Sequence, residues 1–248
     1  MSKLIYIHSK DRLGGSNSST DFQVECRLPM RVRSVVVKSV SFPNLMYNVR
    51  GTSRTFTYSV LGVQANVTVA EGQYSFTQLT DALKTLLDAQ LATAVTFTLN
   101  NITNKASLNF GAGITASVLN RTDGNGMADI LGILVSSGAD AQTHIFTGIP
   151  QLYGVTNALI MSNTLCQGFN AVNSRNDLIG VLTDFPISVA YGEIQHYENN
   201  DSVVNHKQFV TTHVIDVIDI RITDDDGVVL DIGGNDCIIV LKAFPYED

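Results

Sequence analysis

The sequence predicts an all-β fold, and three observations point to this class. Only 16% of the 248 residues are charged, whereas 44% are hydrophobic. Thr, Ser, Asn, Val and Gly make up for the low charged fraction, and the β-branched Thr and Val fit a pleated sheet better than a helix. Short runs of alternating apolar and polar residues recur along the chain between turn-forming residues. The length suits one sandwich or barrel domain.

The first 21 residues are expected to form an N-terminal arm outside the folded domain. Residues 8–21, HSKDRLGGSNSSTD, are polar and rich in Gly and Ser, with little apolar surface beyond Leu13. Gly14 and Gly15 are not followed by G-K-[ST] and precede no helix, so they indicate a linker and not a phosphate-binding loop. We therefore expect this arm to serve in assembly and to contribute little to folding.

The folded domain is predicted to begin with two long strands. In residues 22–28, Phe22, Val24, Cys26 and Leu28 alternate with polar residues, and Pro29 ends the run. Residues 32–42 place Val36, Val40 and Phe42 on one face and Val35, Val37 and Ser39 on the other. Because both faces are largely apolar, this strand is expected at the centre of a sheet.

Further strands and one helix follow in the next part of the chain. The helix begins at Ser75, where S-x-x-Q forms a capping box with Gln78. Its apolar residues recur at helical spacing and predict a buried face, with the helix lying across the end or side of the sandwich. The residues of that face are Phe76, Leu79, Leu83, Leu86 and Leu87, and the strand runs are 55–60, 65–69, 94–99, 106–110 and 114–118.

The middle of the chain, residues 119–185, is predicted to be rich in loops and to hold a possible insertion. Gly and Asn are scattered through it, and only 129–135 and 155–161 are ordered apolar segments. Strands are expected again at 187–191, 214–223, 228–232 and 237–244, with a turn at 224–227. Eight to ten strands with one helix predict a single jelly-roll β-sandwich over residues 22–248.

The residue types that carry catalysis or bind metals form no cluster in the sequence. The histidines form no ligand pair, and the three cysteines form no C-x-x-C motif; they are His8, His144, His196, His206 and His213, and Cys26, Cys166 and Cys237. Glu193 and His196 come nearest to a cupin-like metal pair, and Asp224 to Asp226 fit a hairpin turn better than a calcium loop. We therefore assign no catalytic, cofactor-binding or metal residue, and expect no enzyme.

The charge distribution excludes several classes of partner. The formal net charge is −7, and no basic arm or patch is present to neutralise a nucleic acid. No run of about 18 apolar residues occurs, so no membrane span is expected. The first residues lack the features of a signal peptide, and the cysteine usage favours a reducing compartment.

Four segments, taken in their order, resemble one protein family. They are NSSTDFQVECRLPMRVRSVVVKSVSFPNLMYNV; EGQYSFTQLTDALKTLL followed by VTFTLNNITNKASLNF; Asp129-Ile130-Leu131-Gly132-Ile133; and VIDVIDIRITDDDGVVLDIGGNDCIIVLKAF. Together they cover about half of the chain. They are similar to the penton, or minor capsid, proteins of virophages and Polinton-like viruses, which are single jelly rolls.

The resemblance implies a structural role in a virus shell. It implies a homopentamer at the vertices of an icosahedral capsid, a double jelly-roll major capsid protein as partner, and assembly in the host cell cytoplasm into the virion. We expect the contacts to involve the arm from Ser9 to Asp21 and loops within 119–180. The alternative is a receptor- or carbohydrate-binding β-sandwich, although the chain has no Trp for an aromatic platform.

Overall fold

The computed structural model divides the chain into two compact units. The sandwich unit comprises residues 1–46 and 155–248, and the inserted unit comprises residues 47–154. The structure describes residues 2–14, 16–30, 32–166, 171–172, 178–199, 208–209 and 214–245. The expectation of one domain over 22–248 is therefore corrected. The insertion lies earlier than the predicted 119–185, because residues 47–154 bury a hydrophobic cluster of their own.

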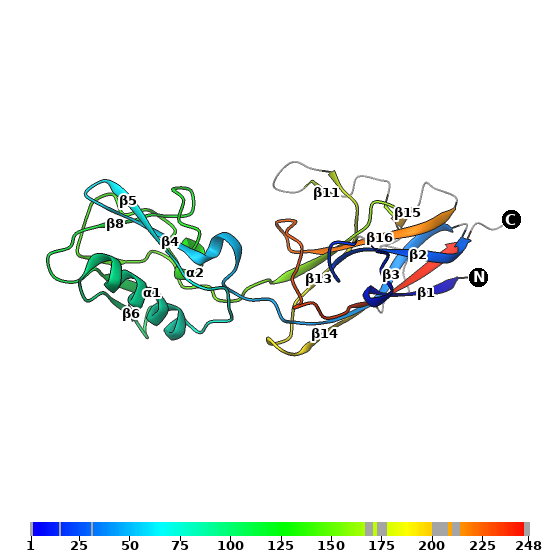
Figure 1. Ribbon diagram of the computed structural model, residues 1–248, viewed down its shortest axis with the longest axis horizontal. Helices are drawn as coiled ribbons and strands as arrows, with labels where there is room; N and C mark the ends of the chain where they lie inside the picture. The colour runs from blue at the N-terminus through cyan, green and yellow to red at the C-terminus, as the bar shows by residue number, and fades with distance from the viewer. Residues whose placement is uncertain are drawn as a thin grey trace. The chain divides into compact units, whose positions relative to one another are not determined.

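The sandwich unit contains two antiparallel sheets (Figure 1). Sheet A has the order β1 (Lys3–His8), β17 (Ile238–Pro245), β3 (Val32–Pro43) and β14 (Ile194–Glu198), with β15 (Gln208–Phe209) also paired to β3. Sheet B has the order β13 (Val181–Pro186), β10 (Asn157–Met161), β16 (Ile215–Thr223) and β2 (Asp21–Met30). A separate pair joins β11 (Ala171–Val172) to β12 (Leu178–Ile179). As the sequence predicted, β3 is a central strand, and β17 beside it is central too.

The strand order of the two sheets is that of a jelly roll. When the two-residue β15 is left out, eight strands remain, and along the chain the first pairs with the last, the second with the seventh, the third with the sixth and the fourth with the fifth. This nested antiparallel pairing arises when one long hairpin is rolled into two sheets. The inserted unit interrupts the connection between the third and fourth strands, β3 and β10.

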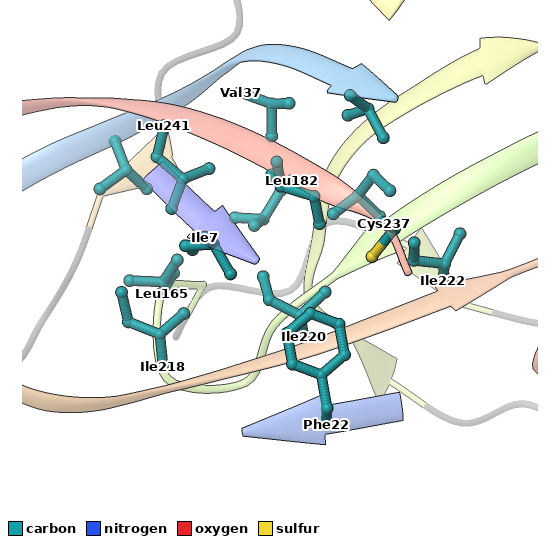
Figure 2. Packing of buried hydrophobic residues seen from close by; sticks show 14 of the residues in the cluster. Ile7, Phe22, Val37, Leu165, Leu182, Ile218, Ile220, Ile222, Cys237 and Leu241 are labelled. Atoms are coloured by element: carbon teal, nitrogen blue, oxygen red, sulfur yellow. The ribbon is translucent and has the colours of Figure 1, made fainter. Parts of the chain in front are cut away.

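One hydrophobic core joins the inner faces of the two sheets. Ile7 of β1, Val37 of β3 and Leu241 of β17 pack in the same cluster as the residues that sheet B turns inward (Figure 2). Those residues include Phe22, Ile160, Leu182, Ile218, Ile220 and Ile222, which are all buried. The period of two in residues 214–223 predicts that Ile218, Ile220 and Ile222 share one face, and the structure confirms that this face is buried. Burial of apolar surface at about 25 cal/mol per Å² is the main term that stabilises this unit.

A β-bulge changes the predicted faces of β3. Opposite β3, the register shifts between Val240 and Leu241 of β17, so Lys38 is an additional residue in β3. Val35 and Val37 before the bulge and Val40 and Phe42 after it therefore all point into the core. Strict alternation had placed these residues on opposite faces.

The inserted unit has two three-stranded sheets and two helices. The sheets are β5 (Val63–Thr68), β4 (Thr55–Val60) and β8 (Ser117–Val118), and β6 (Thr96–Leu99), β7 (Ala106–Asn109) and β9 (Thr143–Ile145). Helix α1 spans Phe76–Leu91, and the short helix α2 spans Ala128–Leu131 where 129–135 had looked apolar. The core of the inserted unit buries large side chains, among them Phe56, Tyr58, Leu108, Phe110 and Leu131.

Helix α1 begins after the predicted cap at Ser75, but its apolar face packs in the core of the inserted unit. The Ser75 hydroxyl accepts a hydrogen bond from the Gln78 amide, and the Gln78 side chain accepts one from the Ser75 amide. Leu79, Leu83 and Leu87 are fully buried in the core of the inserted unit, not against the sandwich. Thr80 is buried as well, and its hydroxyl donates to the backbone carbonyls of Phe76 and Thr77.

The N-terminal segment belongs to the sandwich, which corrects the expectation of an arm over residues 1–21. Strand β1 pairs with β17 along its full length, and the two strands lie side by side near the chain ends (Figure 1). Ser9 is buried, and its hydroxyl donates to the Asp236 carboxylate at 2.9 Å and accepts from the Cys237 amide at 2.9 Å. Thr20 is buried and donates to the Leu230 carbonyl.

The remaining differences concern short strands. Residues 187–191 and 228–232, predicted as strands, form loops apart from a single bridge between Thr223 and Val229. Strands β13 and β14 flank the first of these loops and were not predicted. Strand β2 runs one residue past Pro29, where the sequence predicted its end.

Candidate functional site

The described histidines do not form a common site. His144 is buried in the inserted unit, where its Nε2 lies 2.7 Å from the Ala116 carbonyl and 3.1 Å from the Ala141 carbonyl. His8 and His196 lie on β1 and β14, and His206 and His213 lie outside the described residues. Within the described ranges, no three His, Cys, Asp or Glu side chains approach closely enough to hold a metal ion.

The acidic groups that invited a metal interpretation have structural roles. The Glu193 carboxylate accepts a hydrogen bond from the Ala190 amide in the turn before β14. The Asp224 carboxylate accepts from the amides of Asp226 and Val228 and so closes the predicted turn, in which Gly227 adopts φ +78°. These contacts occupy the carboxylates within their own turns.

The three cysteines are free thiols, and the pKa values of two of them are raised. Burial raises the pKa of Cys237 to about 11, and its Sγ contacts the Ser19 carbonyl at 3.3 Å. Burial, together with the neighbouring Asp216 carboxylate, also raises the pKa of Cys26. A raised thiol pKa disfavours the reactive thiolate, so these residues act as small core side chains.

Asp219 on β16 anchors a turn on the outer side of sheet B. Its carboxylate accepts hydrogen bonds from the Ser162 hydroxyl at 2.9 Å, from the amides of Asn163 and Thr164 at 2.9 and 2.7 Å, and from the Thr164 hydroxyl. Burial acts to raise the pKa of Asp219, but the hydrogen bonds outweigh it and hold the pKa below its usual value. The role is to fasten the chain after β10.

A cavity of about 370 Å³ lies in the sandwich unit. It is lined by the segment around Asn17 to Thr20 and by the loop from Val229 to Asp231. At its rim, Arg12 donates to the Ser9 carbonyl at 3.0 Å and lies 3.8 Å from Asp236. The predicted contact segment Ser9 to Asp21 is thus held by bonds within its own unit.

The outer surfaces of the two sheets differ in chemistry. On sheet A, the side chains that β1 and β17 turn away from the core are mainly apolar: Leu4, Tyr6, Ile238 and Val240. On sheet B, exposed Glu25 and Asp184 point outward, while Arg221 is paired with Asp21 at 3.4 Å. Periodicity had marked which residues leave the core, but only the strand pairing shows that the outward apolar residues of β1 and β17 adjoin.

No helix among the described residues combines the length and apolar character required to cross a membrane.

Comparison with known proteins finds likeness in structure alone. No family model and no curated protein matches this sequence. Solved structures do match, and among them the mavirus penton protein is 10% identical, with 99% of this chain and 100% of that chain covered and a TM-score of 0.56. This chain has the fold of a virophage penton protein. A chain in the structure of the Sputnik virophage is 14% identical over 98% of this chain and 97% of that one, with a TM-score of 0.47.

Proposed function

We propose that this chain is a penton, or minor capsid, protein that forms homopentamers at the vertices of an icosahedral virus shell. The observation that carries the proposal is the match to the mavirus penton protein across both complete chains, inserted unit included. A match to the sandwich alone would support only a jelly roll, because that fold serves many functions.

Three features of the molecule support a structural role. Low charge and an apolar outer face on sheet A suit a protein whose surface is covered by neighbouring subunits. Hydrogen bonds account for the lowered pKa of Asp219 and burial accounts for the raised pKa of Cys237, so neither shift requires a catalytic role. The chain is proposed to act through geometry, without catalysis, cofactor or direct contact with nucleic acid.

The proposed partners are four further copies of the chain and a double jelly-roll major capsid protein in the virion, with assembly in the host cell cytoplasm. Loops within 119–180 are proposed to contribute to these contacts. A wedge-shaped sandwich can meet neighbours on both flanks, as a closed ring of identical subunits requires.

Native mass spectrometry of the purified protein at increasing concentration tests this proposal. We expect a species at five times the 26.9 kDa of one chain. A dimer or trimer as the sole assembled form would count against it. Selective binding of the isolated chain to a glycan array would favour the alternative of a carbohydrate-binding sandwich.

A further inference from the structure

The outer side of sheet A departs from the usual pattern of a two-layer sandwich, in which outward residues are polar. Leu4 and Tyr6 of β1 are 52% and 67% exposed, and Ile238 of β17 is 38% exposed. Tyr6 pairs directly with Val240, and Leu4 pairs with Lys242. These five residues, Leu4, Tyr6, Ile238, Val240 and Lys242, form one surface, here named the β1–β17 patch.

The patch continues into an open strand edge. Strand β1 is the last strand on its side of sheet A in the described part of the chain. The Ser9 amide bonds to Cys237, so by alternation the backbone groups of Leu4, Tyr6 and His8 point away from β17. The corresponding edge of β2 in sheet B is covered instead, because the Leu13 amide and the Ser16 hydroxyl bond to Gln23. An uncovered apolar edge strand is a site at which another chain can dock.

The charges around the patch identify the chemistry of its occupant. Lys242 lies 5.5 Å from the ring centroid of Phe244, which holds its ammonium group over the outer face. A patch that met itself across a two-fold axis would bring two such cations together. The outer side of sheet B instead presents the exposed carboxylates of Glu25 and Asp184, with half-buried Leu159 and Val217 on the same side. The two outer faces of one chain thus complement each other in charge and in apolar surface.

We propose that the β1–β17 patch is the centre of a head-to-tail contact between two copies of this chain, in which it packs against the acidic outer side of sheet B of the neighbouring copy. The inference rests on the proposed function, and it names the surfaces by which the ring closes. Contacts between unlike faces generate closed rings when the rotation permits. A sheet face four strands wide spans only about 19 Å, whereas a stable interface buries about 800 Å² per partner, so residues around the patch complete the contact.

The apolar part of the contact is tested by the double substitution Tyr6→Ser with Val240→Thr. Both side chains point away from the core, so the folded sandwich should be retained, as circular dichroism and thermal melting would show. We expect sedimentation velocity to give a dissociation constant raised about tenfold or more, because central aromatic residues dominate interface energies. The matched control is Ile102→Ser in the inserted unit, where the side chain is 93% exposed; this change should leave association unaltered.

The charge pairing is tested by reversal and rescue. Lys242→Glu should weaken association, and the addition of Glu25→Lys with Asp184→Lys should restore it. Unchanged association in both the apolar and the Lys242→Glu variants would overturn the inference while leaving pentamer formation intact. If the wild-type chain forms a ring that is not pentameric and these variants lose association, the inference would be supported and the vertex function overturned. A chain that stays monomeric up to millimolar concentration would contradict both.

Discussion

At the scale of single residues, Asp219 shows how a polar position can carry structure. The alternation on β16 predicts correctly that it leaves the core, and from that alone its replacement by Asn would be nearly silent for folding. The structure corrects this expectation, because the carboxylate accepts four hydrogen bonds from the turn at Ser162 to Thr164. These donors lie far away in sequence, so no local pattern reveals them.

We predict that Asp219→Ala lowers the free energy of unfolding by on the order of 3 kcal/mol, because hydrogen bonds to a charged group are strong and their donors would remain partly buried. The pKa of Asp219 is lowered in the folded state, so its contribution is present above the unfolded pKa and is lost as the pH falls through the folded pKa. Urea unfolding at pH 7 and near pH 3 should show the variant's deficit shrinking in acid. Asp184→Asn, an exposed acid on the same face, serves as the control; a deficit independent of pH would contradict the account.

Ile220 provides the complementary prediction, since it is buried between the two sheets (Figure 2). Ile220→Asp places a charge without a partner in the core and should prevent stable folding of the sandwich unit, because domains are stable by only about 5–15 kcal/mol. Arg221→Gln, one residue further and exposed, removes a surface ion pair that contributes about 1 kcal/mol or less. Similar melting temperatures for the two variants would mean that the register of β16 is wrong by one residue.

At the scale of elements, the largest difference between the sequence-based prediction and the structure is the N-terminal strand β1. Strand β1 is short, and its partner strand β17 lies at the opposite end of the chain. Periodicity reports only which residues share a face, and it carries no information about such distant pairing. The bulge in β3 and the placement of α1 were missed for the same reason, whereas the capping box of α1 is local and was predicted correctly.

We predict that a chain beginning near Ser19 loses the folded sandwich, contrary to what its polar sequence suggests. The truncation removes β1 with the core residue Ile7 and the hydrogen bonds that Ser9 makes to Asp236 and Cys237. Circular dichroism and thermal melting of the truncated and full chains provide the comparison. Ile7→Ala is the milder variant and should cost about 2–5 kcal/mol. A truncated chain that melts at the temperature of the full chain would restore the interpretation of these residues as an arm.

At the scale of the whole molecule, the chain combines a jelly roll with an inserted unit that has its own core. The jelly-roll fold was predictable from the four segments that resemble the penton family. The first and last of these segments contain β2, β3, β16 and β17, whose alternating residues and turns are visible in the sequence. The boundaries of the insertion were not predictable. Both units are built from similar short strands, so composition does not change where one unit ends and the other begins.

The two cores predict that the sandwich unit folds without the insertion. The Asn48 side chain donates to the carbonyls of Tyr74 and Leu152, at 2.8 and 3.1 Å, and so holds the two ends of the inserted unit together. A short Gly-rich turn in place of residues 49–151 should therefore close at small entropic cost. We expect a β-type circular dichroism spectrum and one cooperative melting transition. Loss of cooperativity in this shortened chain would show that the two units fold as one.

The position of this chain in an assembled shell decides whether it is a vertex protein. Co-expression with a double jelly-roll major capsid protein, followed by cryo-electron microscopy of the particles, would locate it. We expect five copies of the chain around each vertex, with the β1–β17 patch of one copy against sheet B of the next. Closed shells whose vertices lack the chain, or in which it occupies positions away from the fivefold axes, would show that it is not a penton protein.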